Sequence, residues 1–124
     1  MNLSRSVLIP FLKARHATGT VENDMKERPI KATQSAMMYQ WFTVLSKKYL
    51  NEAAINAIAA DPRLIIHFSY ASWNGEGWFK RFATSLNSAI KNNAPDIFAA
   101  AFSARKNSIN PVIRQQAANM ERLF

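Results

Sequence analysis

Prolines and glycines are scarce in this chain, so the few places where a helix is interrupted can be read from the sequence. The 124 residues include five prolines and three glycines. Proline suits the first position of a helix because its missing N–H would have no partner there, and Asp and Asn are good caps for the position before it. Three helix starts are therefore predicted, at Asp61-Pro62, Ala94-Pro95-Asp96 and Asn110-Pro111.

Apolar residues recur at helical spacing along nearly the whole chain, and no alternating strand pattern exceeds a few residues. A helix that starts at Thr33 or Ser35 is expected to be heavily buried, and Asn51 is expected to cap a shorter one. The predicted core stripes are Met37–Trp41–Val44–Leu45–Lys48, Phe79–Ala83–Leu86–Ile90 and Ile113–Ala117–Met120–Phe124.

These patterns predict one all-α domain over residues 1–124, folded as a compact bundle of six or seven helices. Residues 1–34 are expected to form an N-terminal helix and a polar loop, and residues 35–124 the helical core. At this length a single domain buries roughly two-thirds of the surface that its unfolded chain exposes.

The chain lacks the residues that several classes of chemistry require. It has no cysteine, which excludes disulfides and thiolates, and its two histidines are too few for a His-rich metal centre. Phosphate-binding glycine loops, metal-ligand spacings and Ser-His-Asp contexts are absent from the sequence. We therefore expect no metal and no cofactor. His67, in the apolar run "LIIHFSYA", is interpreted as a core residue bonded to the backbone.

The formal net charge is +8, which attracts polyanions such as nucleic acid, anionic lipid or the acidic polymers of a bacterial envelope. The basic residues are dispersed and form no continuous run. No segment is long enough to span a bilayer. The apolar run over residues 7–12 is short and lacks a cleavage site, so we expect no secretory signal peptide.

Two of the three glycines, Gly75 and Gly77, lie in the sequence "WNGEGW" between Trp73 and Trp78. A helix over residues 62–73 is expected to end here, and the next to begin at about Trp78. Asn74 and Gly75 suit left-handed backbone at the end of the first helix, and Gly77 would allow a tight turn into the second. The tryptophans would pin this elbow by burying apolar area on either side of it.

Glu76 lies between these two glycines, beside the start of the following helix. The exposed amides of a helix start favour an ionised carboxylate and so lower its pKa. A general acid needs the opposite, a pKa raised by an apolar pocket. We therefore interpret Glu76 as a solvated charge in preference to a catalytic acid.

The sequences "WNGEGWFKRFATSLNSAI" and "ARKNSINPVIRQQAANMERLF" together resemble the C-terminal half of phage-encoded, lysozyme-like peptidoglycan hydrolases. These are muramidase-type enzymes related to glycoside hydrolase family 108. The match covers residues 35–124 and is a pattern of helix ends more than a catalytic signature. It rests on Trp73, Asn74, Gly75, Gly77, Trp78, Phe79, Arg105, Asn110, Pro111, Ile113, Arg114 and Gln115. The resemblance implies a lysozyme-like α-lobe and a phage-derived domain that binds or hydrolyses peptidoglycan.

The resemblance also implies a catalytic glutamate near the start of the domain, in a Glu-Gly-Gly type motif followed by a Gly- and Asp-rich segment. The first thirty residues contain no such motif. Their carboxylates are Glu22, Asp24 and Glu27, in a polar loop that also holds Lys26 and Arg28. Glu22 is the candidate for a displaced catalytic acid, with Asp24 as its partner. The alternative is that all three are solvated loop charges.

Five residues, four of them near the elbow in sequence, are candidates for contact with a substrate. Tyr70 lies three residues before Trp73 on the same helix, so their rings would line one side of a groove, and Asn74 and Glu76 follow. Core packing is the alternative for at least one tryptophan. Arg105, near a helix end, would face the negative pole of that helix or contact an anionic ligand.

Three functions remain open at this point. The first is a phage-derived domain, in the virion or the host cell envelope, that binds peptidoglycan or cleaves it as a glycosidase with a protonated carboxylic acid. The second is a non-catalytic virion or tail structural protein that keeps a lysozyme-like scaffold and binds other virion proteins. The third is a basic helical module that binds nucleic acid, which the dispersed basic residues and the lack of a recognisable reading helix disfavour.

Overall fold

The computed structural model describes residues 32–122 and 124, with side chains described from residue 40 onwards. This part of the chain folds into six α-helices and contains no strand, which confirms the all-α prediction. Of the predicted N-terminal helix and polar loop, only residues 32–34 are described, and they begin the first of these helices. The helices are α3 (Ala32–Tyr49), α4 (Glu52–Ala60), α5 (Pro62–Asn74), α6 (Glu76–Lys91), α7 (Ile97–Lys106) and α8 (Pro111–Glu121).

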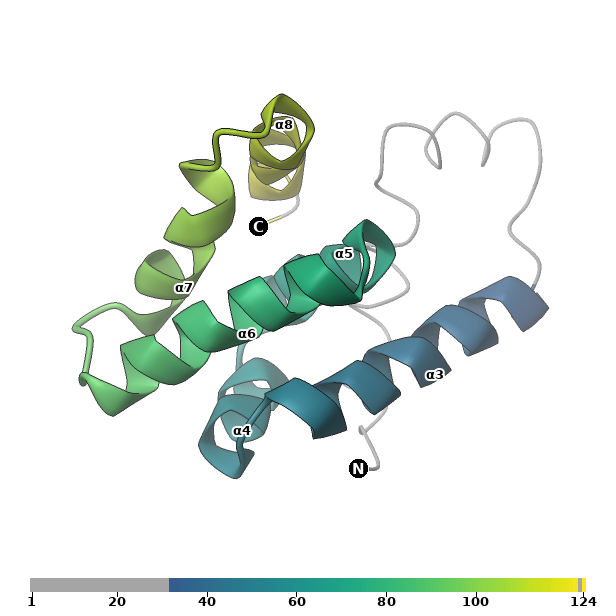
Figure 1. The fold of residues 1–124 in the computed structure, drawn as a ribbon, viewed down its shortest axis with the longest axis horizontal. Coiled ribbons are helices and arrows are strands. Elements are labelled where there is room, and N and C mark those ends of the chain that lie inside the picture. Colours follow the sequence, from purple (N-terminus) through teal and green to yellow (C-terminus); the bar gives the residue numbers. More distant parts are fainter. Residues whose placement is uncertain (1–31, 123) are drawn as a thin grey trace.

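Helix α5 is the centre of the bundle. Every residue from Leu64 to Ser72 is buried, because α3, α4, α6 and α7 all contact this helix. Figure 1 shows α6 in front of α5, with α3 and α7 to either side. A helix that is apolar nearly all round can be buried on every side. Its serines pair within the helix: the Ser69 hydroxyl donates to the Ile65 carbonyl and the Ser72 hydroxyl to the Ser69 carbonyl, both at 2.6 Å.

Three of the helix starts are those that the caps predict. Asn51, Asp61 and Asn110 cap α4, α5 and α8, and each side-chain oxygen accepts a backbone N–H two or three residues later, at 2.8 to 3.0 Å. Pro62 and Pro111 occupy the first turns of α5 and α8. These contacts depend only on neighbouring residues, so they could be predicted without knowledge of the packing.

The start predicted at Pro95 is wrong. Helix α7 begins at Ile97, and Asp96 is its cap, with Oδ1 accepting the N–H of Ala99 at 2.9 Å. Pro95 therefore precedes the cap. The side-chain acceptor, and not the proline, decides where this helix begins.

Helix α3 is only partly buried over its described side chains, so the expectation of heavy burial is wrong, and only part of the predicted stripe faces the core. Phe42 and Leu45 are fully buried, whereas Trp41 is 38% and Val44 49% exposed. Lys48, which the predicted stripe also included, is exposed. Both faces of this helix carry apolar residues, so the spacing alone could not choose between them. Packing against α5 and α6 selects the face that contains Phe42.

The core consists of two clusters that meet at α5. The larger joins α3, α4, α5 and α6, with Phe68, Phe79 and Phe82 at its centre. The smaller one packs α8 against α5 and α7, and α8 buries the predicted residues Ile113, Ala117 and Met120 across the two. Phe124 was predicted on the same face, but it follows the end of the helix and is 42% exposed.

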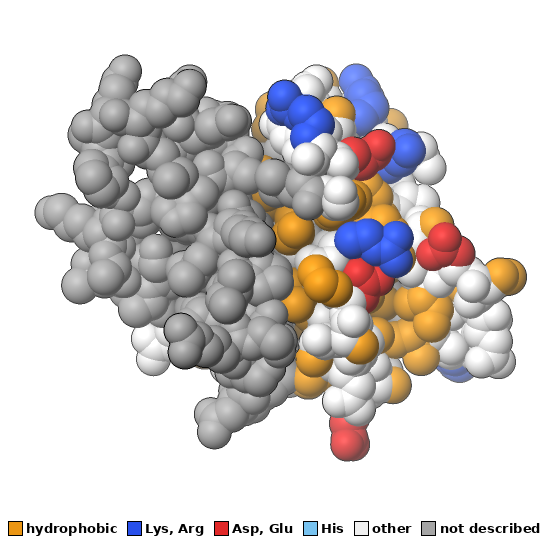
Figure 2. Space-filling model, turned by 180° about the vertical axis from the view of Figure 1, so that it is seen from behind, with side chains coloured by type: hydrophobic (Ala, Val, Ile, Leu, Met, Phe, Trp, Pro, Cys, Tyr) orange, Lys and Arg blue, Asp and Glu red, His pale blue; other side chains and the backbone are white. Residues whose placement is uncertain are grey.

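Charges of both signs are interspersed on the face of the bundle that Figure 2 shows. Lys and Arg side chains lie beside Asp and Glu side chains, and apolar groups separate them. On this face the described surface is therefore mixed in charge. None of the described helices has the length and apolar character that a membrane crossing requires.

Candidate functional site

The residues predicted to contact substrate fall into two separate places. Most lie inside the bundle, around the side chain of Arg105, while Glu76 lies on the surface at the elbow. We call the internal group the buried arginine centre; it consists of Arg105, His67, Tyr70, Asn74 and Gln116. We call the external group the elbow surface; it consists of Lys48, Tyr49, Glu76, Trp78 and Arg81.

Arg105 comes from α7 and is fully buried, with 0% of its surface exposed. Its Nε donates to Nδ1 of His67 at 3.1 Å, and its Nη2 donates to the His67 carbonyl oxygen at 3.3 Å. Its Nη1 donates to the side-chain oxygens of Asn74 and Gln116, both at 2.8 Å. The amide oxygens of Asn74 and Gln116 and the backbone carbonyl oxygen of His67 carry no net charge, and a neutral imidazole carries none either. The guanidinium thus ties α5, α7 and α8 together through neutral acceptors.

Burial sets the protonation states in this centre. It lowers the pKa of Arg105 to about 9, which leaves the guanidinium charged at neutral pH. The rings of Phe82 and Tyr70, whose centroids lie 4.4 and 5.9 Å from the Arg105 Cζ, stabilise the cation. Burial, and then the charge of Arg105, hold the pKa of His67 well below its usual 6.5. The imidazole is therefore neutral, and because Nδ1 accepts from Arg105, its proton lies on Nε2.

Tyr70 and Arg105 require a correction, because both are 0% exposed and cannot contact a polymer at the surface. Tyr70 lies in the core, and the Arg105 guanidinium bonds to His67, Asn74 and Gln116 inside the bundle. Trp73 is half-buried and packs its ring on Tyr70, with centroids 5.4 Å apart. The Asn74 amide is occupied at both ends, since its Nδ2 also donates to Gln116 at 3.0 Å. Tyr70 is buried because it lies on α5, which other helices of the bundle surround.

Gly75 alone connects α5 to α6 at the elbow. Helix α5 extends to Asn74 and α6 begins at Glu76, earlier than the predicted start. Gly75 has φ 113° and ψ 165°, a conformation that residues with a Cβ atom rarely adopt, which confirms its predicted role. Gly77 lies in the first turn of α6, and its predicted role in turning the chain is wrong. The single residue Gly75 makes the whole turn.

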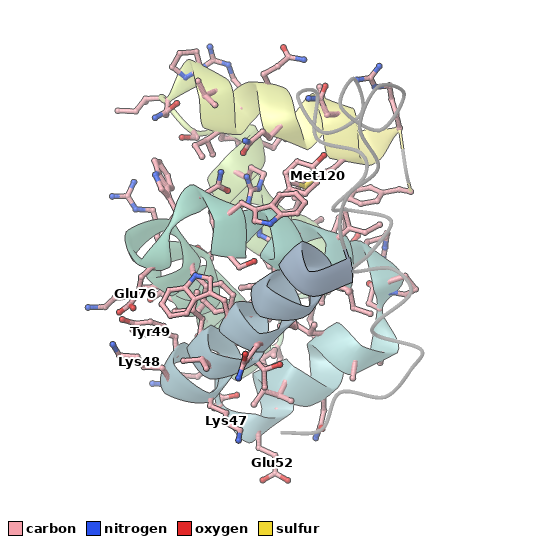
Figure 3. The ribbon with its side chains drawn as sticks, turned by 90° about the vertical axis from the view of Figure 1, so that its right-hand side faces the viewer. Lys47, Lys48, Tyr49, Glu52, Glu76 and Met120 are labelled. Carbon is pink, nitrogen blue, oxygen red and sulfur yellow. The ribbon has the colours of Figure 1, made fainter. Side chains whose placement is uncertain are left out.

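The elbow surface is formed where the end of α3 meets the first turn of α6 (Figure 3). Glu76 Oε2 accepts a hydrogen bond from Lys48 Nζ at 2.8 Å and another from the Tyr49 hydroxyl. These hydrogen bonds, the one from Lys48 first, lower the pKa of Glu76, and Glu76 in turn raises the pKa of Lys48. Glu76 is thus ionised, as predicted, with two side-chain partners that the sequence did not reveal. An ionised carboxylate cannot act as a general acid.

Trp78 and Arg81 complete the elbow surface. Trp78 is half-buried and stacks on Phe82, with centroids 5.8 Å apart and planes inclined by 28°. The exposed Arg81 places its Cζ 4.8 Å from the Trp78 ring centroid. The two tryptophans of the elbow pack against different clusters, Trp73 against the smaller and Trp78 against the larger. They do not form one paired wall.

Two of the hollows in the described part of the chain lie away from the tryptophans. One, of about 280 Å³, lies beside α7 and the end of α8 and includes Phe98, Phe102 and Phe124. The other, of about 330 Å³, adjoins the elbow surface, because Asn87 Nδ2 donates to the Tyr49 carbonyl oxygen at 3.1 Å. We call it the polar hollow; its lining residues are Asn51, Thr84, Asn87, Ser88, Ile90 and Lys91.

The remaining described carboxylates have other roles. Asp61 and Asp96 cap helices, Glu121 forms a surface ion pair, and Glu52 is exposed in the first turn of α4. None of these four is enclosed in an apolar pocket, which is the usual setting of a general acid. Glu22 lies outside the described residues. Within residues 40–122, no three His, Asp or Glu side chains gather to hold a metal ion.

Sequence reasoning missed the partnership of His67 and Arg105. His67 is a core residue, as predicted, but its Nδ1 bonds to a side chain 38 positions away and not to the backbone. The signal that was present is an ionisable residue in or beside an apolar run on each of two helices, His67 on α5 and Arg105 on α7. Buried polar groups need partners, yet the spacing along one helix cannot identify a partner on another.

Comparisons with known proteins gave no match, whether to a family model, to a curated protein or to a solved structure. The contacts described above are therefore the main basis for a proposal about function.

Proposed function

We propose that this chain is a cell-wall-active domain of phage origin that binds peptidoglycan through the elbow surface, in the virion or the host cell envelope. The resemblance of residues 35–124 to phage lysozyme-like hydrolases supports it, and the net charge of +8 suits an anionic wall. One observation carries the proposal: the exposed Arg81 lies over Trp78, and Glu76, just before Trp78 in sequence, forms an accessible ion pair with Lys48.

This surface offers the groups that recognition of an acidic sugar polymer needs. The indole of Trp78 provides an apolar contact for a sugar ring, and the guanidinium of Arg81 donates hydrogen bonds to oxygen atoms. Lys48 and Glu76 keep 58% and 38% of their side-chain surface exposed, so both can still reach a ligand. Glu76, being ionised, accepts hydrogen bonds from sugar hydroxyls and positions them.

Hydrolysis needs an additional group, a protonated carboxylic acid at the glycosidic oxygen. The described carboxylates are ion-paired, cap helices or lie exposed, and Glu22 remains the candidate acid. This observation favours a second candidate function, a non-catalytic virion or tail protein that binds the wall without cleaving it.

Binding is tested by sedimentation with purified peptidoglycan sacculi. We expect Arg81→Glu to weaken binding about tenfold, which corresponds to about 1.4 kcal/mol. Arg122→Glu makes the same change of charge on α8, where Arg122 bonds to Asn119 at 2.8 Å, and should bind like the wild type. Equal losses in the two variants would show that only net charge matters. A wild-type chain that stays in the supernatant would refute the proposal.

Cleavage is tested by a zymogram on purified peptidoglycan over a range of pH. If the chain is a hydrolase, Glu22→Gln should abolish clearing. Glu76→Gln should weaken clearing without abolishing it, because Glu76 contacts sugar hydroxyls but donates no proton. No clearing by the wild type at any pH, combined with sedimentation, identifies the non-catalytic form. Clearing that disappears only in Glu76→Gln would contradict the role given to Glu76.

A further inference from the structure

The polar hollow and the elbow surface both include residues of α6, and Tyr49 of the elbow surface bonds to Asn87 of the hollow. The Tyr49 hydroxyl donates to Glu76 on the elbow surface, and its carbonyl oxygen accepts from Asn87 in the hollow at 3.1 Å. At 1.5 Å per residue, the part of α6 from Trp78 to Lys91 is about 20 Å long. Contact with both regions would therefore require an extended polymer.

The hollow is rich in hydrogen-bond donors that no described residue uses. Lys91 carries an exposed ammonium group and forms no ion pair with the described part of the chain. The hydroxyl of Ser88 is exposed and has no bonding partner among the described side chains and backbone groups. Asn51 uses Oδ1 to cap α4, accepting from Ala54 at 2.8 Å, which leaves its Nδ2 donors available.

The hollow also contains hydrogen-bond acceptors. The Thr84 hydroxyl donates its proton to the Lys80 carbonyl oxygen at 2.9 Å and keeps only acceptor capacity. Asn87 Oδ1 is buried beneath the surface and receives no hydrogen bond from any described donor, so Asn87 shapes the floor of the hollow. No carboxylate lines the hollow. Donors beside an ammonium group, with no acid among them, favour a ligand group made of anionic oxygens.

We propose that the polar hollow binds a carboxylate of the wall polymer, with Lys91 as its ion-pair partner and Ser88 and Asn51 as hydrogen-bond donors. This inference rests on the proposed function, because peptidoglycan carries free carboxylates on its peptide branches. The elbow surface then contacts the sugar strand, and the hollow contacts a peptide branch. The ligand is recognised by charge as well as by its sugar rings.

The experiment compares native sacculi with sacculi whose carboxylates have been converted to neutral amides. Wild-type binding should fall about tenfold on amidation, which alters carboxylates and leaves wall phosphates unchanged. The double variant Ser88→Ala/Lys91→Gln should bind native sacculi about tenfold more weakly and respond less than twofold to amidation. Lys106→Gln removes one exposed charge outside the hollow and should keep the full response.

The outcomes separate the two proposals. Equal binding of the wild-type chain to both kinds of sacculi would overturn the carboxylate site and leave peptidoglycan binding in place. Loss of binding when wall phosphate alone is removed would assign the contact to phosphate, which also overturns the carboxylate site. A double variant that keeps the full response to amidation moves the carboxylate contact to the cations of the elbow surface and also overturns it. Wild-type chain that binds neither preparation refutes the proposed function itself.

Discussion

The buried arginine centre and the elbow surface each place a guanidinium beside an aromatic ring, with opposite consequences. Arg105 lies 4.4 Å from the Phe82 ring and has no exposed surface, while Arg81 lies 4.8 Å from the Trp78 ring and is exposed. The local contact is nearly the same. Burial decides whether the cation holds helices together or remains available to a ligand.

The comparison extends to the partners of each cation. An exposed cation such as Lys48 pairs with a carboxylate at little net gain in stability, because water solvates both groups. Arg105 has neutral acceptors and no water-exposed surface, so its desolvation is offset by four hydrogen bonds and by ring contacts. Stability should therefore depend on Arg105, and ligand binding on the elbow surface.

The largest effect is expected from Arg105→Met. It should lower the free energy of unfolding by about 3 kcal/mol or more, because the fully buried Nδ1 of His67 and the half-buried side-chain oxygen of Asn74 lose their donor. Arg81→Met is the matched control and should change stability by about 0.5 kcal/mol or less. Urea denaturation of both variants measures the difference. Equal effects would remove the distinction between the two arginines.

A smaller effect is expected at Gly75, which joins the two regions. Gly75→Ala should destabilise the protein by about 1 to 3 kcal/mol, since an alanine at φ 113° is strained even though no neighbouring atom lies within 4 Å. Gly77→Ala is the matched control, in the first turn of α6, and should be neutral or stabilise by up to about 1 kcal/mol. Thermal unfolding of the pair tests whether Gly75 alone makes the turn.

The smallest effect is a dependence of stability on pH that comes from His67. The folded state holds the pKa of His67 below its unfolded value near 6.5, so the unfolded chain binds more protons as the pH falls through this range. Stability should be fully present above pH 6.5 and decline below it, by up to about 1.4 kcal/mol per pH unit. Denaturation at pH 7.0, 6.0 and 5.5 measures the slope.

The variant His67→Gln should lose this slope, while His16→Gln, at the other histidine of the chain, should retain it. A slope that survives in His67→Gln would assign the titration to another group. It would also contradict the neutral imidazole in the buried arginine centre.

The elements predicted best are those whose evidence is local. Asn110 and Pro111 predict the start of α8, and the apolar spacing that follows correctly predicts that Ile113 and Ala117 are buried. At the elbow, the sequence correctly predicted that Gly75 turns the chain. The prediction that Gly77 also contributes to the turn is wrong, because Gly77 lies inside α6. In each case the relevant contact lies within one turn of helix, where sequence spacing carries the information.

The candidate site was predicted less well, because its contacts join distant parts of the chain. Trp73 and Tyr70 looked like a groove lining, yet α5 is covered on all sides and Tyr70 is buried. Glu76 was expected to be ionised, but its partners on α3 could not be seen in the sequence. The apolar spacing also could not predict which of the two apolar faces of α3 points inward, because both faces fit the helical period.

By itself, the sequence determined that the described part of the chain is helical, where three of its six helices begin, and that the run around His67 must be buried. Caps, prolines and apolar periodicity act between residues a few positions apart, so they operate before any packing exists. Only the tertiary structure decided that Arg105 meets His67 across 38 residues and that Lys48 meets Glu76 across 28. These pairings follow from how the helices pack around α5, and that arrangement assigns one cation to the interior and leaves another at the surface.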